Sequence, residues 1–277
     1  MSKILVIPDN MEDIDKYNDK DIKGLIFGFK DLSVNNNLYL DIDSLKDIIK
    51  DINSKFEIWI SLNKIMHNKD LELLENTLIE LDKLKITGIL FYDLGVLNIC
   101  KRLNLNIKLS IYQDHLNASI NSNNFYYNKG VEYSLVTNDI TIDEVLDINN
   151  KSNIKMMVNV YGYLPIFYSR RYLVSNYMEY INKDKLDYIY YLKDKDDYYP
   201  IVEEDYGTTV YTKYPINLIK YIDKLNSIEY IILNSNYIDK NEFMSVLDKY
   251  INKDIDDNDN YEGFSNTKTI YTVKNYE

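Results

Sequence analysis

Cysteine is nearly absent from the sequence. Cys100 is the only one among 277 residues, so no disulfide can form within the chain and an oxidising compartment is not required. A single thiolate also cannot build a cysteine-ligated zinc or iron–sulfur site from this chain alone. We expect Cys100 to be a small core residue on a helix, and we expect no cofactor.

Long hydrophobic runs and an excess of positive charge are missing too. No stretch approaches the ~18 uncharged apolar residues of a membrane span, and Met1–Asn10 reads as a strand and a turn rather than a signal peptide. The chain has 32 basic and 44 acidic residues, a formal net charge of −12, which repels phosphate backbones and anionic membranes. We therefore expect a cytoplasmic protein without membrane contact or broad nucleic-acid binding.

Short apolar runs are plentiful and predict buried strands. Apolar residues make up 45% of the chain, enough for a sizeable core. Several runs lack clean alternation, which is typical of strands that are buried on both faces. The eight runs are Lys3–Ile7, Gly24–Phe29, Phe56–Leu62, Gly88–Tyr92, Ile107–Tyr112, Tyr133–Thr137, Ile154–Tyr161 and Ile228–Leu233.

Amphipathic helices fit between these runs. Leu45, Ile48 and Ile49 share one helical face, and Thr141 followed by Glu144 is a capping-box pattern. Alternating strands and helices make the strands parallel, and about eight of them predict an α/β fold, a closed (β/α)8 TIM-type barrel. An open doubly wound sheet is the alternative, but no Gly-x-Gly-x-x-Gly follows any strand.

One segment interrupts the alternation between the seventh and eighth runs. Tyr199-Pro-Ile-Val, a Glu-Glu-Asp-Tyr-Gly turn and the run 208–211 predict a β-hairpin with Gly207 near the turn. We interpret residues 178–212 as an insertion after the seventh strand, at the C-terminal face of a single barrel domain over residues 1–252. Residues 253–277 read as an acidic linker and a tail in which Thr269–Val273 could pair as an edge strand.

Polar residues that follow the predicted strands are the candidates for chemistry, since strand C-termini converge at one face of a barrel. Asp93 could instead cap a helix, and His67 could lie on the surface. A metal site from His67, His115 and Asp93, or a triad with Ser169, lacks any supporting spacing, so we expect no metal. The candidates at the strand ends are Asn63, His67, Asp93, Gln113, Asp114, His115, Asn138, Asp139, Arg170 and Arg171.

Arg170 and Arg171 form a basic pair on an acidic chain. Their guanidinium groups could hold a carboxylate or phosphate through forked hydrogen bonds. Alternatively they could form ion pairs with Glu203, Glu204 or Asp205 of the predicted hairpin.

Several segments resemble the collagenase-like peptidases of peptidase family U32, in particular their short bacterial branch. Asn63-Lys-Ile-Met-His-Asn68 and Gly88-Ile-Leu-Phe-Tyr-Asp-Leu-Gly-Val96 are similar to a strand ending in Asn, a His-Asn loop, and a strand leading to Asp-x-Gly-Val. The segment 161–177, which begins Tyr161-Gly-Tyr-Leu-Pro, is similar to the family's His-Gly-x-x-Cys-x-x-x-Ser pattern and includes Ser169, Arg171 and Asn176. The similarity extends over nearly the whole chain.

The chain departs from that pattern where the family carries polar groups. Tyr161 replaces the histidine of His-Gly, Pro165 replaces the nearby cysteine, and Asn138-Asp139 stands where the family often has Arg-Glu. Members that hydroxylate RNA bases or quinones use cysteine-bound iron–sulfur clusters, which this chain cannot hold by itself.

Two functions therefore stay open. The resemblance implies a peptidase, a hydrolase of peptide substrates, with His67 and Asp93 as acid–base residues. Its substrate-binding residues would be Asn63, Gln113, Ser169, Arg170, Arg171 and Asn176. The alternative is a non-catalytic barrel that binds a small anionic molecule or a partner protein. The peptidase hypothesis expects Asn63, His67, Asp93 and Arg171 to point into one cavity.

Overall fold

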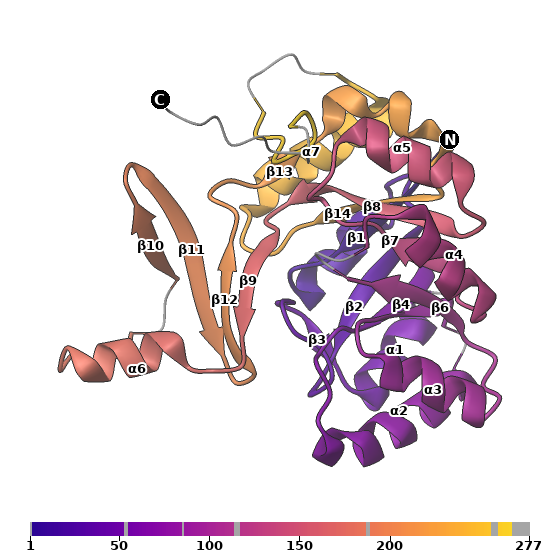
Figure 1. Cartoon of the computed structure of the whole chain (residues 1–277), viewed down its shortest axis with the longest axis horizontal. Coiled ribbons are helices and arrows are strands. Elements are labelled where there is room, and N and C mark those ends of the chain that lie inside the picture. Colours follow the sequence, from indigo (N-terminus) through magenta and orange to yellow (C-terminus); the bar gives the residue numbers. More distant parts are fainter. Residues whose placement is uncertain are drawn as a thin grey trace, which may run out of the picture.

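A computed structural model of the chain describes residues 2–52, 55–84, 86–113, 117–186, 189–255 and 260–267. Eight parallel strands form its centre, each paired with the next, and β1 pairs with both β2 and β14 so that the sheet closes (Figure 1). The predicted (β/α)8 barrel is confirmed, and the open-sheet alternative is wrong. The barrel strands are β1 (Lys3–Ile7), β2 (Gly24–Phe29), β4 (Glu57–Leu62), β5 (Gly88–Phe91), β6 (Lys108–Tyr112), β7 (Tyr133–Leu135), β8 (Lys155–Gly162) and β14 (Tyr230–Asn234).

Helices cover the outside of the barrel. Asp93 caps α3 (Leu94–Arg102) and Thr141 caps α5 (Ile142–Lys151), and the capping box of Thr141 with Glu144 is present. The connection between β1 and β2 contains the 3-10 helix η1 (Met11–Tyr17) instead of an α-helix. The other elements around the barrel are β3 (Tyr39–Leu40), α1 (Ile42–Asp51), η2 (Asn68–Asp70), α2 (Leu71–Lys83), α3 (Leu94–Arg102), α4 (Ile120–Asn128), α5 (Ile142–Lys151), β13 (Ile216–Asn217), η3 (Ile219–Tyr221), η4 (Lys224–Ser227) and α7 (Lys240–Asn252).

Aliphatic and aromatic side chains together fill the barrel interior. Alternate residues of a strand point inward, and they form one buried cluster around Trp59. The Trp59 ring meets Tyr133 edge-on at 5.1 Å and Tyr230 at 5.8 Å between centroids. Gly88 leaves room for it, because a Cβ there would lie 2.6 Å from the indole ring. A second, larger cluster packs the outer strand faces against the helices.

A four-stranded antiparallel sheet projects from the C-terminal face of the barrel (Figure 1). We call it the projecting sheet; its order is β10 (Tyr190–Asp194), β11 (Asp197–Glu204), β12 (Gly207–Tyr211) and β9 (Pro165–Ser169), with α6 (Leu173–Tyr180) beside it. The β11–β12 hairpin was predicted, as was its place after the seventh strand. The sheet starts earlier than residue 178, because β9 pairs with β12. Gly207 has φ +136°, and a Cβ there would lie 2.1 Å from the Ser169 carbonyl oxygen.

The described part of the tail packs against the barrel instead of extending away from it. Asn217 donates its backbone N–H to Tyr261 O at 2.9 Å, and Ile142 donates to Ser265 O at 3.0 Å. The predicted strand Thr269–Val273 lies outside the described residues. No helix in the described ranges has both the length and the apolar character needed to cross a membrane.

Candidate functional site

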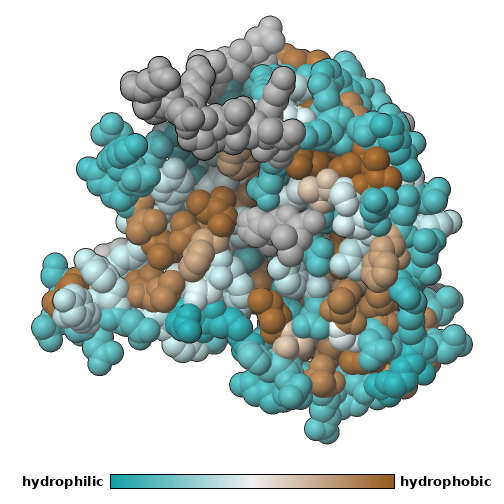
Figure 2. Space-filling view, viewed as in Figure 1, coloured by the Kyte–Doolittle hydropathy of each residue, from teal (hydrophilic) through white to brown (hydrophobic). Residues whose placement is uncertain are grey.

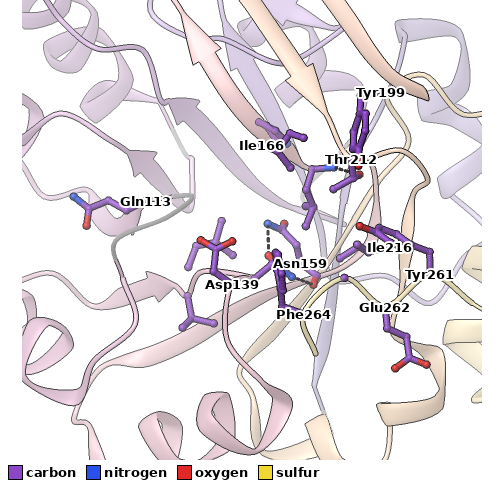
Figure 3. A pocket seen from close by; sticks show the side chains of 16 residues that line it. Gln113, Asp139, Asn159, Ile166, Tyr199, Thr212, Ile216, Tyr261, Glu262 and Phe264 are labelled. Carbon is purple, nitrogen blue, oxygen red and sulfur yellow. Dashed lines mark hydrogen bonds between the residues drawn. The ribbon is translucent and has the colours of Figure 1, made fainter. Parts of the chain in front are cut away.

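A cleft of about 410 Å³ opens at the C-terminal mouth of the barrel, and we call it the mouth cleft (Figure 3). It lies where β6, β7 and β8 end, and the projecting sheet and the tail segment 260–267 complete it. Its lining residues are Gln113, Leu135, Val136, Asn138, Asp139, Asn159, Leu164, Pro165, Ile166, Tyr199, Thr212, Ile216, Tyr261, Glu262, Gly263 and Phe264. This is the face at which barrel enzymes bind substrates.

Three side chains give the mouth cleft its polar floor. Asn138 donates from Nδ2 to the Asn159 carbonyl at 3.0 Å, and Asn159 returns a longer bond of 3.4 Å to Asn138 Oδ1. The Asp139 Oδ2 accepts from Thr137 Oγ1 at 2.8 Å. Asp139 and Asn159 lie near Phe264 in Figure 3, whereas Gln113 stands apart at one side.

Apolar side chains form the remaining wall of the mouth cleft. Ile166 from β9 is 43% exposed and Phe264 from the tail is 53% exposed. Figure 2 shows brown, apolar residues on the projecting sheet beside the barrel. An apolar wall with a few fixed polar groups suits a small or peptidic ligand.

The tail holds one side of the mouth cleft in place. Glu262 accepts from Tyr221 Oη at 2.7 Å and forms an ion pair with Lys220, so its carboxylate turns away from Asp139 and Asn159 in Figure 3. Burial raises the pKa of the Tyr261 hydroxyl, which keeps that lining group neutral.

Hydrogen bonds within the protein involve the side chains of Asn63 and Asp93 and the backbone of His67. The buried Asn63 amide binds both backbone groups of Val34, accepting from its N–H at 2.9 Å and donating to its oxygen at 3.0 Å. Asp93 accepts from Gly95 N at 2.7 Å and from Met66 N at 3.2 Å, which makes it the helix cap considered above. His67 is exposed, and its backbone N–H donates to Asp70 Oδ2 at 2.8 Å.

The other predicted site residues divide between the projecting sheet and the cavities. Ser169 Oγ accepts from the Arg171 N–H at 3.2 Å, and Arg171 and Asn176 are exposed. Arg170 donates from Nη1 to Ile65 O at 3.3 Å. No ion pair joins either arginine to Glu203, Glu204 or Asp205, all of which the structure describes, so that alternative is not observed.

The structure does not bring the predicted residues into one cavity. Gln113 lines the mouth cleft, and Arg170 lines a second cavity between the β11–β12 turn and the loops after β2 and β4. Asn63, His67, Asp93 and Arg171 line neither of these. Asp114 and His115 lie outside the described residues. Across the described ranges, no three His, Cys, Asp or Glu side chains are grouped to hold a metal ion.

A partly buried cluster of tyrosines around Glu204 was not predicted from the sequence. Tyr39 Oη donates to Glu204 Oε2 at 3.3 Å and contacts the Tyr206 hydroxyl, while Tyr211 and Tyr237 stack edge-on at 5.3 Å. Burial raises the pKa of Glu204 to about 7. The tyrosine-rich composition was the available signal, but nothing in the sequence shows which tyrosines surround the acid.

One sequence-family model covers nearly the whole chain. The sequence model described as peptidase family U32 matches residues 9–269. In Bacillus subtilis (strain 168), "tRNA hydroxylation protein P2" is 24% identical over 177 residues, which covers 61% of this chain and 57% of that protein. "tRNA hydroxylation protein P1" of the same organism is 22% identical over 122 residues, 44% of this chain and 29% of that protein.

The chain thus matches little more than half of one curated relative and less than a third of the other. Among solved structures, the U32 peptidase Mk0906 has a TM-score of 0.56 and 11% identity, covering 84% of this chain and 92% of that one. That likeness shows a shared barrel fold.

Proposed function

Because the chain belongs to peptidase family U32, we propose that it takes part in tRNA hydroxylation as a ligand-binding barrel, with the mouth cleft as its ligand site. The observation that carries the proposal is that both curated relatives are named tRNA hydroxylation proteins. The fold alone would not favour this activity, since one barrel supports many chemistries.

The local geometry favours ligand binding over peptide hydrolysis by the predicted pair. Both carboxylate oxygens of Asp93 accept backbone hydrogen bonds, so an acid–base role would require breaking a helix cap. The mouth cleft, in contrast, combines an apolar wall with Asn138, Asp139 and Asn159.

The proposal requires a partner protein. With Cys100 as its one cysteine, the chain cannot by itself hold a cysteine-bound redox cluster. Its net charge of −12 also opposes unaided binding of a tRNA backbone. We propose that a partner contributes most of the tRNA contact and that this chain contributes the cleft.

A gene replacement tests the proposal. Removing the gene from its host should lower the hydroxylated nucleosides in total tRNA, measured by liquid chromatography and mass spectrometry, and the wild-type gene should restore them. Ile166→Asp places a charge in the apolar wall and should fail to restore them. Phe167→Asp is the matched control, because Phe167 is the exposed neighbour on β9 that does not line the cleft. Unchanged tRNA in the deletion strain would contradict the proposal.

Peptide hydrolysis is the second candidate, favoured by the family's description as peptidases. In it His67 and Asp93 act as acid and base at the C-terminal face. Purified protein should then cleave gelatin or a peptide library, and His67→Ala should abolish cleavage. Undiminished cleavage by that variant would remove His67 from the mechanism, and no cleavage by the wild type would remove the candidate.

A further inference from the structure

The second cavity, of about 870 Å³, brings several cations together at the C-terminal face, and we call it the Arg170 cavity. It lies between the β11–β12 turn and the loops that follow β2 and β4. Its lining residues are Lys30, Asp31, Ser33, Tyr39, Asp41, Ser44, Lys64, Lys69, Arg170, Tyr172, Glu204, Asp205 and Tyr206. We propose that the Arg170 cavity binds a small oxyanion, a carboxylate or phosphate group, through Arg170, Lys69 and Lys30.

Three of the four cations that line the cavity have N–H donors that no other described residue occupies. The Arg170 guanidinium has one hydrogen bond within the described ranges, to Ile65 O, which leaves most of its five N–H donors available for a forked bond to an oxyanion. Lys30 and Lys69 form no ion pair with another described residue. Lys64 differs, because it is largely buried and bonded to Asp31 O and Asp70.

The carboxyl groups of the cavity cancel this charge only in part. Asp41 accepts from Ser44 N at 2.8 Å as the cap of α1, so one of its oxygens is directed at the helix. Hydrogen bonding to Ser44 holds its pKa below the usual range. Asp31 and Asp205 are exposed and well solvated, which weakens their competition with a bound anion.

Glu204 makes the charge of the cavity depend on pH. Tyr39, Tyr206, Tyr211 and Tyr237 surround it, and Asp205 is its acidic neighbour. Burial raises its pKa to about 7, so below that pH the carboxyl is neutral. The lining then has four cations, of which Lys64 is paired with Asp70, against three carboxylates, whereas above that pH it has four carboxylates. Anion binding should therefore be tighter on the acidic side of pH 7.

The site is independent of the proposed function and can be tested on the purified chain. Isothermal titration with inorganic phosphate and with malonate should give saturable binding. Arg170→Ala should weaken it by about tenfold or more, and Arg170→Lys, which keeps the charge but loses the fork, by less. Arg171→Ala is the matched comparison, because Arg171 is exposed and outside this cavity. Melting curves of each variant check that it is folded.

Three results would overturn the inference: no saturable binding of either probe to the wild type, an equal loss for Arg170→Ala and Arg171→Ala, or equal binding of malonate above and below about pH 7. Malonate is the probe for the pH comparison because phosphate changes its own charge near this pH. Glu204→Gln should remove the pH dependence of malonate binding while keeping the site. A parallel titration with mixed tRNA separates the two sources of phosphate. Competition of phosphate by tRNA, lost in Arg170→Ala, would identify the site as a contact for the RNA backbone instead of a small molecule.

Discussion

Glu204 and Glu203 are adjacent on β11 but lie in opposite electrostatic environments, so their substitution by Gln should have opposite effects on stability. Glu204 is surrounded by tyrosines, and burial raises its pKa from 4.5 to about 7. Glu203 accepts hydrogen bonds from Val174 N at 2.7 Å and Ser175 N at 3.1 Å, and pairs with Lys185 at 3.1 Å. Burial alone would raise the Glu203 pKa, but the Ser175 and Lys185 contacts outweigh it and lower the pKa.

The direction in which Glu204 changes the free energy of unfolding follows from its raised pKa. Its protonated form is preferred in the folded state, so its contribution to the free energy of unfolding is complete below pH 4.5 and is lost as pH rises to about 7. At about 1.4 kcal/mol per pH unit the full difference is about 3 kcal/mol, and partial solvent screening reduces it to about 2 kcal/mol. Glu204→Gln removes this penalty and should stabilise the protein above pH 7.

Melting curves at about pH 5 and about pH 8.5 test this prediction. For a chain of 277 residues, 2 kcal/mol corresponds to a rise in Tm of about 3 °C. Glu204→Gln should show that rise at the higher pH and little change at the lower one. Glu203→Gln should lower Tm at both of these pH values, with the loss shrinking only as the pH falls below 4.5, because the pKa of Glu203 is lowered in the folded state. A Tm change for Glu204→Gln that is the same at both pH values would refute the reasoning.

Three further outcomes are expected from the packing. Gly88→Ala should lower the free energy of unfolding by about 1–3 kcal/mol in denaturant titrations, because its Cβ would meet the Trp59 ring at 2.6 Å; unchanged stability would show that Trp59 can shift. Thr141→Ala should cost about 1 kcal/mol by removing half of the capping box with Glu144, and an equal stability of the two proteins would contradict that role. Burial raises the pKa of the Cys100 thiol to about 12, so iodoacetamide at neutral pH should label it much more slowly in the native than in the unfolded protein; equal rates would show that the thiol is accessible.

Most of the barrel could be predicted from the sequence, because local patterns determine its strands and helix starts. The run predicted at 56–62 became β4 at Glu57–Leu62, and Thr141 caps its helix as expected. The strands β9 and β13 were not predicted. Both depend on partners far along the chain, β12 and β8, and their residues lack a distinctive local pattern.

The candidate site was less predictable for a related reason. Gln113 and Asp139 follow strands and were found by that rule, but Asn159 lies within β8 and Glu262 in the tail. These residues meet only because the tail folds back onto the barrel. Asn63 and Asp93 also follow strands, yet they bind nearby backbone groups. A polar residue at a strand end is therefore consistent with either a ligand contact or a loop anchor.

The pairing of β1 with β14 places Lys3 opposite Tyr230, which has a consequence for biosynthesis. On the ribosome the projecting sheet emerges before β14, and its antiparallel hairpins join residues that are close in sequence, such as Glu204 and Gly207. Local pairings of this kind form faster than distant ones. We therefore expect the sheet to fold while the first strand still lacks its second neighbour. Closure of the barrel would then be a late, slow step, during which β1 and β8 expose strand edges that a chaperone could protect.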